Sequence, residues 1–256
     1  NGVINKDLSL ENTSFNFFAD ESDILIKNIK SEMDGLKIKK GNLQIKRNQE
    51  IILKSDFITD IKINNKNIGK YLPYLKNTKF INQETNFNAN LENFLNITFD
   101  KTFKVIDYVY TNKGKISKSA FKFDNSLKNS ILEKDLNYLY LKDSNLNITY
   151  ALDKKNYINA SGAYSFDNKN YHNYDLKNDF AMGISNINLN FEFSEKFNIN
   201  FINYKKDQGK LANIFLNVQT KKDSINFKEL KYSESKNQIL IKKLRFNKKD
   251  LVSLQK

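Results

Sequence analysis

The sequence lacks, or has very little of, several residue types that carry chemistry or shape turns. Among 256 residues there is no Cys and no Trp, and there are only 1 Pro, 8 Gly and 1 His. Without cysteine the chain forms no disulfide, no thiolate metal site and no cysteine nucleophile. Because glycine and proline normally mark tight turns, we expect asparagine, which tolerates left-handed dihedral angles, to form turns such as residues 63–66 and 111–114.

The single histidine, His172, lies in a polar stretch from Lys169 to Tyr174 that has the character of a loop. Catalysis by histidine needs a nucleophile or an orienting carboxylate, and a metal site needs further ligands. The sequence contains no glycine-rich phosphate cradle. Its acidic residues are scattered over polar strand positions and turns, which favours a solvated surface role over an acid–base pair. We therefore predict that the chain is not an enzyme and holds no cofactor and no metal.

Long apolar runs are also missing. No stretch is long enough to span a bilayer as a helix, and no signal peptide is present. The chain begins with Asn1 instead of methionine, which predicts a piece of a longer protein whose membrane anchor or targeting segment lies outside it.

The charge is strongly one-sided, with a formal net charge of +13, yet only Arg47 and Arg245 are arginine. Phosphate-binding surfaces favour the planar guanidinium fork, so the lysines indicate a solvated outer face, although attraction to an anionic membrane surface stays open. Proteins that stack nucleic-acid bases place aromatic rings and cations on one face. In residues 101–110 and 239–246 the two kinds alternate and so fall on opposite faces, which argues against nucleic-acid binding.

The feature that dominates the sequence is a two-residue alternation of apolar and polar side chains. It is clearest in residues 186–193 and resumes in residues 197–201, with apolar residues at the odd positions. Successive side chains of a strand point to opposite faces, so this pattern predicts a sheet with one apolar and one polar face. The 20 Phe and 13 Tyr make that apolar face rich in rings.

Most of the chain is expected to form strands of one continuous antiparallel sheet, in a single elongated domain over residues 1–256. The first forty residues are the least regular, with a connecting turn at residues 20–23. Two helices are expected, a short or kinked one within residues 67–77, with Asn67 as N-cap and Pro73 as an interruption, and a second over residues 126–139. The expected strands are residues 43–46, 51–57, 58–63, 80–91, 94–99, 103–110, 115–123, 144–152, 157–166, 179–193, 197–203, 211–220, 224–232 and 238–246.

Three arrangements could cover the apolar face of such a sheet. A second sheet would make a sandwich, membrane lipid would surround a closed barrel, and a sheet curled into a trough would hold acyl chains inside. Two expected helices and the lack of matched hairpin strands argue against the transmembrane barrel. Periodicity alone leaves the sandwich and the trough open.

Several segments resemble a known family. Residues 96–105, leading through Tyr108–Tyr110 into Gly114–Ser119, look like the middle region of large AsmA-like proteins, in particular the YhdP branch. Residues 201–207 with 212–213, and residues 225–227 with 243–246, have the same texture. The likeness covers most of residues 40–250 and contains no catalytic signature, so no catalytic residue is carried over.

The resemblance implies an all-β fold with minor helix content, in which a long twisted antiparallel β-sheet curls into a groove with an apolar interior. It also implies a periplasmic location in a Gram-negative envelope, anchored in the inner membrane by a segment outside this chain. Phospholipid acyl chains would be the partners, sliding along the groove between inner and outer membrane. The residues expected to line it are Phe103, Val105, Phe121, Phe123, Leu146, Ile148, Tyr150, Ile187, Leu189, Phe191, Phe193, Phe197, Ile199, Phe201, Ile214, Leu216 and Val218.

Physical chemistry agrees with this picture, because an acyl chain that leaves a bilayer exposes its methylene groups at a cost of about 0.8 kcal/mol each. A continuous apolar strip removes most of that cost without trapping the lipid. The alternative function is a structural or protein-binding β-sandwich domain of a cell-envelope protein.

Overall fold

The computed structural model describes residues 2–5, 8–72, 82–127, 132, 134–247 and 250–255. The fold is all-β and consists mainly of a large antiparallel sheet that is not closed, as the alternation predicted. The described helical segments are α1 (Ile68–Tyr71) and a short 3₁₀ turn at Asn200–Ile202. Two compact units make up the chain: unit 1 comprises residues 1–122 and 141–156, and unit 2 comprises residues 123–140 and 157–256.

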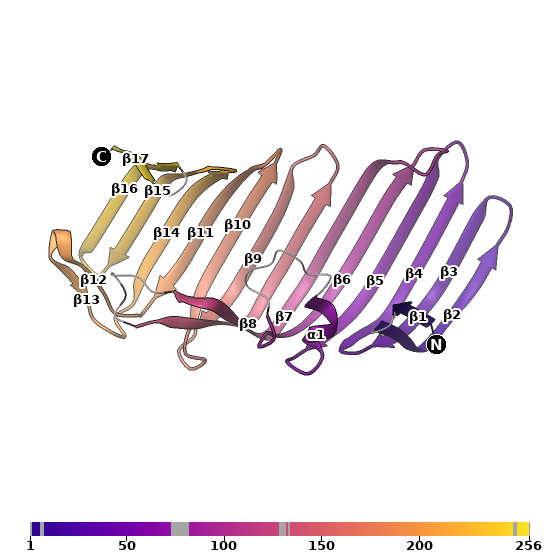
Figure 1. The fold of residues 1–256 in the computed structure, drawn as a ribbon, viewed down its shortest axis with the longest axis horizontal. Coiled ribbons are helices and arrows are strands. Elements are labelled where there is room, and N and C mark those ends of the chain that lie inside the picture. The colour runs from indigo at the N-terminus through magenta and orange to yellow at the C-terminus, as the bar shows by residue number, and fades with distance from the viewer. Residues whose placement is uncertain are drawn as a thin grey trace. The chain divides into compact units, whose positions relative to one another are not determined.

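Unit 1 is a meander in which hydrogen-bonded neighbours follow the order of the chain (Figure 1). Two of its strands, β7 and β8, are shared with unit 2: unit 1 contains β7 up to residue 122 and β8 from residue 141. Its strands are β1 (Gly2–Asn5), β2 (Leu8–Ala19), β3 (Asp23–Met33), β4 (Leu36–Arg47), β5 (Ile51–Ile63), β6 (Asn86–Phe99), β7 (Val105–Leu127) and β8 (Leu136–Ala151).

Aspartate and asparagine side chains shape the turns of unit 1. Asp20 Oδ1 accepts hydrogen bonds from the backbone N–H groups of Ser22 (2.8 Å) and Asp23 (2.7 Å), which closes the predicted turn between β2 and β3. Asp100 Oδ1 does the same for the turn before β7, accepting from Thr102 N–H at 2.8 Å. These side chains mimic a backbone turn, and so replace the scarce glycine and proline.

The segment after β5 confirms the expected turn at residues 63–66 and the start of the first helix. Asn64 Oδ1 accepts from the N–H of Lys66 at 2.9 Å, and α1 begins at Ile68. Asn67 stands at the N-cap position, but its side chain makes no capping bond and instead accepts from the N–H of Asn64 at 2.8 Å. Pro73 and the remainder of the expected helix lie outside the described residues.

Unit 2 continues in the same manner, with its own run of sheet neighbours from β9 to β11 and from β14 to β17 (Figure 1). A separate two-stranded hairpin, β12–β13, is inserted between β11 and β14. The strands are β9 (Asn156–Ser165), β10 (His172–Ala181), β11 (Ile184–Phe193), β12 (Phe197–Ile199), β13 (Tyr204–Lys206), β14 (Ala212–Lys221), β15 (Ser224–Glu234), β16 (Asn237–Asn247) and β17 (Asp250–Gln255).

Several predicted element boundaries were wrong. Residues 111–114, expected to form a turn, lie in the middle of β7, where they pair with β6, and the strands expected at 80–91 and 94–99 correspond to the single strand β6. The strand expected at 179–193 is two strands, β10 and β11, joined by a turn at Met182 and Gly183, both with positive φ. The polar residues of a half-solvated strand resemble those of a loop, which explains both kinds of error.

The prediction of a second helix over residues 126–139 was also wrong. Of residues 126–139, residues 126 and 127 end β7 and residues 136–139 begin β8, while residues 128–131 and 133 are outside the described part of the chain. The first forty residues, expected to be irregular, form β2, β3 and the start of β4. In β2 and β3 the register shifts and the positive φ angles of Asn12 and Asn28 interrupt the alternation, so periodicity alone failed to reveal the strands.

Candidate functional site: the apolar face of the sheet

Strand register gathers the apolar side chains of unit 2 on one face of β10, β11, β14, β15 and β16. Opposed residues share a face, and one row across the five strands reads Leu176, Leu189, Leu216, Leu230 and Ile241. The full apolar face of unit 2 consists of Tyr174, Leu176, Phe180, Ile187, Leu189, Phe191, Phe193, Ala212, Ile214, Leu216, Val218, Ile225, Phe227, Leu230, Tyr232, Ile239, Ile241, Leu244 and Phe246.

The opposite face of the same strands is mostly polar, with Phe215 and Leu240 as apolar exceptions. In β11 it presents Asn186, Asn188, Asn190 and Glu192, and in β16 it presents residues such as Lys242 and Arg245. Most side chains of the apolar face are only half-buried, although they are apolar. Among the described residues the only second sheet is the β12–β13 hairpin, so no facing sheet covers the middle of this face.

A register shift between β14 and β15 keeps the apolar face continuous at the point where the apolar–polar alternation of β15 changes phase. Apolar residues fall at odd positions up to Phe227 and at even positions from Leu230, with Lys228 and Glu229 between them. The register shift between Asn217 and Val218 of β14 leaves Lys228 as an extra residue in β15. This β-bulge returns Leu230 to the same face as Phe227.

One end of the apolar face is covered by the β12–β13 hairpin. Phe197 of β12 packs against Phe193 and Tyr232, with ring centroids 6.1 Å and 5.5 Å apart, and its side chain is 7% exposed. Ala212 lies in the same cluster and is completely buried. Leu132 bridges to Phe197 from the segment before β8. This end is therefore a packed core, whereas most side chains on the remainder of the face are only half-buried.

A buried polar group fixes the hairpin in place. The Tyr204 and Tyr232 hydroxyls lie 2.7 Å apart, and both donate to the Glu234 carboxylate. The hydrogen bond from Tyr204 lowers the pKa of Glu234, an effect that burial opposes, and burial raises the pKa of Tyr232. The fully buried Lys206 donates to the carbonyl groups of Glu195 (3.1 Å) and Asp207 (3.2 Å), and burial lowers its pKa. Tyr204, Tyr232, Glu234 and Lys206 thus each have a hydrogen-bond partner.

Unit 1 has an apolar face too, but polar residues interrupt its middle. Its apolar members on β3 to β7 are Ile24, Ile26, Met33, Leu36, Ile38, Leu43, Ile45, Ile51, Leu53, Phe57, Ile61, Ile63, Phe87, Ala89, Leu91, Leu95, Ile97, Phe99, Val105, Tyr108, Tyr110 and Ile116. On the same face stand Ser55, Thr59, Asn93 and Asn112, which together with Tyr110 we call the polar cluster.

Hydrogen bonds join the polar cluster across β5, β6 and β7. Asn93 Oδ1 accepts from the Tyr110 hydroxyl at 3.0 Å and from Asn112 Nδ2 at 2.6 Å, while Asn93 Nδ2 donates to Thr59 Oγ1 at 3.1 Å. Asn112 Nδ2 also donates to the Tyr110 hydroxyl at 3.3 Å. Asn112 is 4% exposed, and its Oδ1 atom is buried without a partner among the described residues.

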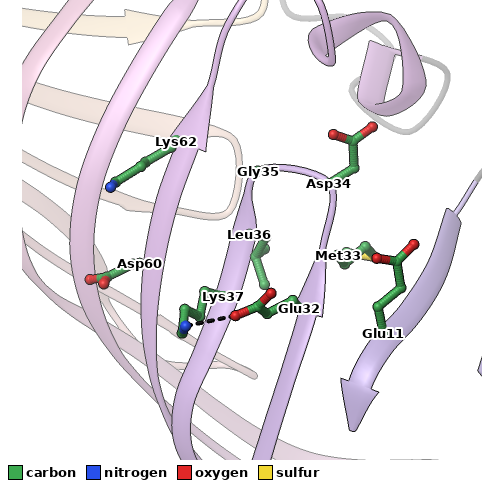
Figure 2. A pocket seen from close by; sticks show the side chains of 9 residues that line it. All are labelled: Glu11, Glu32, Met33, Asp34, Gly35, Leu36, Lys37, Asp60 and Lys62. Carbon is green, nitrogen blue, oxygen red and sulfur yellow. Dashed lines mark hydrogen bonds and ion pairs between the residues drawn. The ribbon is translucent and has the colours of Figure 1, made fainter. Parts of the chain in front are cut away.

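A charged cleft of about 350 Å³ lies at the turn between β3 and β4 (Figure 2). Its charges are mostly paired: Lys37 Nζ lies 2.6 Å from Glu32, which lowers the pKa of that carboxyl, and Lys70 Nζ lies 2.5 Å from Asp34. A hydrogen bond from Lys39 lowers the pKa of Asp60 in the same way. This cleft is a site of exposed ion pairs and gives no reason to expect a ligand.

His172 differs from its expected place in a loop. It begins β10, is half-buried, and its Nε2 atom lies 2.6 Å from Ser194 Oγ. Its ring also contacts the edge of the Tyr164 ring, at 6.2 Å between centroids. Within the described part of the chain no carboxylate orients the imidazole, so the pair lacks the third member of a catalytic triad.

Of the residues predicted to line a groove, those of β11 and β14 share the apolar face of unit 2: Ile187, Leu189, Phe191, Phe193, Ile214, Leu216 and Val218. Phe197 and Ile199 lie instead on the hairpin, and the side chain of Phe201 is outside what the structure describes. The prediction did not include Tyr174, Leu176 and the apolar residues of β15 and β16, which stand on the same face, although their own alternation was a usable signal.

The remaining predicted lining residues belong to β7, β8 and the turn before β7. Leu146 packs against the core of Ala89, Leu91 and Ile116, and Ile148 and Tyr150 follow it on the same side of β8. Phe121 and Phe123 are half-buried in β7, where the Phe121 ring lies 6.3 Å from that of Phe87. Val105 begins β7 and is 43% exposed, whereas Phe103 lies in the preceding turn, with φ 62° and 70% exposure, and not on a strand as predicted.

Comparison with known proteins adds no relative, because no family model, curated protein or solved structure matches this chain. None of the helices in the described residues is long and apolar enough to cross a membrane. The described residues also contain no group of three or more histidine, aspartate or glutamate side chains that could hold a metal ion.

Proposed function

We propose that this chain is a non-enzymatic lipid carrier segment that shelters acyl chains on the apolar face of its sheet. The observation that supports the proposal is the apolar face of unit 2, which continues across β10, β11, β14, β15 and β16 and stays half-exposed. Contiguous exposed apolar surface of this extent is rare on proteins that work alone in water. Its natural cover is another apolar body.

The chemistry of the face suits acyl chains. Leucine, isoleucine and phenylalanine offer non-directional contacts, and burial of each methylene group of a lipid contributes about 0.8 kcal/mol. Such contacts are nearly equal at every step along the strip, so a chain held there moves with little barrier. The polar residues on this face of unit 2 stand at its ends, Asn178, Ser185 and Thr220 at one and Glu234 with Asn237 at the hairpin end.

The resemblance to AsmA-like proteins of the YhdP branch supports a more specific version of the proposal. In that version the chain is part of a periplasmic, inner-membrane-anchored bridge that moves phospholipid between the inner and outer membranes. The polar faces of the strands would stay in water while acyl chains lie on the apolar side. The anchor would be supplied by a segment outside this chain.

Photocrosslinking tests the general proposal with a pair of neighbouring residues. A photoreactive amino acid at Leu216, on the apolar face, should crosslink to phospholipid, whereas the same probe at Asn217, on the polar face, should not. Mass spectrometry of lipid extracted from the purified protein provides an independent measurement. Protein that is free of lipid and gives no crosslink at Leu216 would disprove the proposal.

A second candidate function is a structural or protein-binding domain of the cell envelope. The β12–β13 hairpin favours it, because the packing of Phe197 against Phe193 demonstrates that a protein segment can cover this face. In that case the probe at Leu216 should crosslink to a protein partner and not to lipid.

A further inference from the structure

The turn between β6 and β7 presents a large apolar residue whose presence the fold itself does not explain. Phe103 has a φ of 62° and is 70% exposed. This left-handed conformation suits glycine and asparagine and is costly for a large side chain. Because most of the ring is in water, burial within the chain offsets little of that cost. The stability of unit 1 therefore does not account for a phenylalanine at this position.

The conformation of the turn is held without the phenylalanine ring. Asp100 Oδ1 accepts hydrogen bonds from the backbone N–H groups of Thr102 (2.8 Å) and Lys104 (3.0 Å). The N–H of Phe103 donates to the Asp100 carbonyl oxygen at 3.1 Å, and the N–H of Asp100 donates to the Lys104 carbonyl oxygen at 2.9 Å. All of these bonds use backbone groups or the Asp100 carboxylate. An asparagine at position 103 would keep them.

The other turns at this edge of unit 1 have polar tips. Because neighbouring strands are antiparallel, the turns that follow β2, β4 and β6 lie at one edge of the unit (Figure 1). Residues 20–22 of the first turn are Asp-Glu-Ser, and residues 48–50 of the second are Asn-Gln-Glu. The exposed ring is thus particular to the β6–β7 turn.

The apolar face of unit 1 reaches the edge of the sheet beside this turn. Val105 pairs with Phe99, and Phe99 pairs with Ile51, so three strands bring apolar residues of that face to the edge. Val105 is 43% exposed, and Ile106 next to it is 40% exposed. Phe103 stands two residues before Val105, so the exposed apolar surface extends past the last paired residues.

The turn between β8 and β9 adds lysines to the same place. The N–H of Leu152 donates to the carbonyl oxygen of Tyr108 at 3.1 Å, which puts this turn beside the start of β7. Lys154 Nζ lies 3.7 Å from Asp107, and both Lys154 and Lys155 are exposed. Two turns therefore form one exposed surface, residues 100–107 and 152–155, which we call the turn edge.

The turn edge combines an apolar tip with lysines. Lys101 and Lys104 flank Phe103 in the chain and are exposed. Residues 100–107 and 152–155 contain four lysines and three aspartates, so the net charge is only slightly positive. Lysine keeps its ammonium group in water while its methylene groups lie along apolar surface. A ring that enters the apolar layer, with ammonium groups at the level of the phosphates, fits the surface of a phospholipid bilayer.

We propose that the turn edge docks on a phospholipid bilayer, with Phe103 inserted among the headgroups and the lysines at the lipid phosphates. The apolar face of unit 1 then meets the membrane at the edge where Val105 is exposed. This inference rests on the proposed function and deepens it, because it names the place where the face exchanges acyl chains with a membrane.

A single tryptophan tests the insertion, because the chain contains none of its own. The full chain carrying Phe103→Trp is mixed with vesicles of phosphatidylcholine, with or without phosphatidylglycerol. We expect a blue shift of the tryptophan emission in both mixtures. Phe94→Trp is the matched control, since Phe94 is 42% exposed on the polar face of the same unit, and its emission should not shift.

A second variant separates docking from stability. Phe103→Asn should weaken partitioning onto the vesicles by about tenfold, because one phenylalanine side chain no longer leaves water. Its thermal midpoint should stay unchanged or rise, since asparagine tolerates the left-handed conformation, whereas a ring needed for folding would lower it. Phe94→Asn should leave partitioning unchanged.

The contribution of the lysines is measured with the anionic vesicles. Lys101→Gln and Lys104→Gln should each weaken binding to vesicles that contain phosphatidylglycerol by about fivefold. Binding to pure phosphatidylcholine should change less, because that surface carries no net charge.

The results that would overturn the inference differ from those that would overturn the proposed function. An unshifted emission of Phe103→Trp, or equal partitioning of Phe103→Asn and the unmodified protein, would disprove docking through the turn edge. A photoreactive amino acid at position 103 that crosslinks in cells to protein and not to phospholipid would disprove it as well. The proposed function is judged instead by the lipid crosslink at Leu216, and vesicle docking without that crosslink would contradict the proposed function.

Discussion

The apolar faces of the two units are built from the same alternating pattern but differ in where their polar residues stand. In unit 2 the polar positions Asn178, Ser185 and Thr220 lie at one end, and a packed hairpin closes the other. In unit 1 Asn93 and Asn112 lie in the middle and bond to each other. Unit 2 thus offers a uniform surface, whereas the face of unit 1 is interrupted in its middle. The two-residue alternation is the same in both units, and the positions of a few polar residues decide whether a face is uniformly apolar or interrupted.

The largest expected effect concerns the covered end of unit 2. Replacing Phe197 with alanine removes the ring that packs on Phe193 and Tyr232, which should destabilise the unit by about 3–5 kcal/mol. Thermal denaturation and hydrogen exchange of the amides of residues 197–206 measure the loss. Phe94→Ala, at a site 42% exposed on the polar face of unit 1, is the control and should cost far less. Equal losses in the two variants would show that the hairpin is not a packed core.

The next effect concerns the close approach of β6 and β7 in unit 1. A Cβ atom on Gly114 would overlap the Asn90 carbonyl oxygen and lie 2.9 Å from the Cα of Leu91. Because these are backbone atoms, Gly114→Ala should cost about 2–3 kcal/mol in urea unfolding. Gly69→Ala, whose nearest contact would be 3.7 Å, is the matched control and should be neutral or stabilising. An unchanged midpoint for Gly114→Ala would contradict the tight pairing next to Asn112.

A smaller effect depends on pH and is expected in unit 2, where Tyr204 and Tyr232 bond to the ionisable side chain of Glu234. The polar cluster of unit 1 contains no carboxylate. Hydrogen bonding from Tyr204 lowers the pKa of Glu234 below its ordinary value of 4.5, so the charged form stabilises the folded state. That contribution is present above pH 4.5 and is lost as the pH falls through the lowered pKa. Glu234→Gln should therefore cost about 1.5–3 kcal/mol at neutral pH and progressively less in acid.

Denaturation of Glu234→Gln over a pH series measures this difference. Glu229→Gln, which lies on the opposite face from Leu230, is the control. The difference between Glu234→Gln and the unmodified protein should narrow below pH 4.5. If the difference in unfolding free energy between the two proteins stays constant over the whole pH series, the charge of the Glu234 carboxylate is not its cause.

The smallest effect is expected at the charged cleft of unit 1. The Lys37–Glu32 pair spans 2.6 Å, but its side chains are 56% and 42% exposed, so solvent screens it. Lys37→Ala should leave the unfolding midpoint unchanged within error and should not alter lipid retention. A clear loss of bound lipid in this variant would indicate that lipid binds at the cleft and not on the apolar face.

The sequence predicted the strands of regular alternation well and the interrupted ones poorly. β14, β15 and β16 appeared close to their expected places, because each keeps one phase or changes it only once. β10 was partly taken for a loop, since Asn173, Asp175 and Lys177 on its polar face resemble loop residues. The turn expected at residues 111–114 failed because asparagine is equally suited to turns and to hydrogen bonding between neighbouring strands.

By itself the sequence determined that the protein is an antiparallel sheet with an apolar and a polar face, because side-chain direction in a strand follows a period of two residues. It also determined that Leu189 and Phe191 share a face, since this follows from their spacing alone. Only the tertiary structure decided which strands pair, where the bulge at Lys228 restores the phase, and that the hairpin covers Phe193. The tertiary structure also decided that Asn112 pairs with Asn93 and donates a hydrogen bond to it. These are contacts between residues far apart in the chain, and a local period carries no information about them.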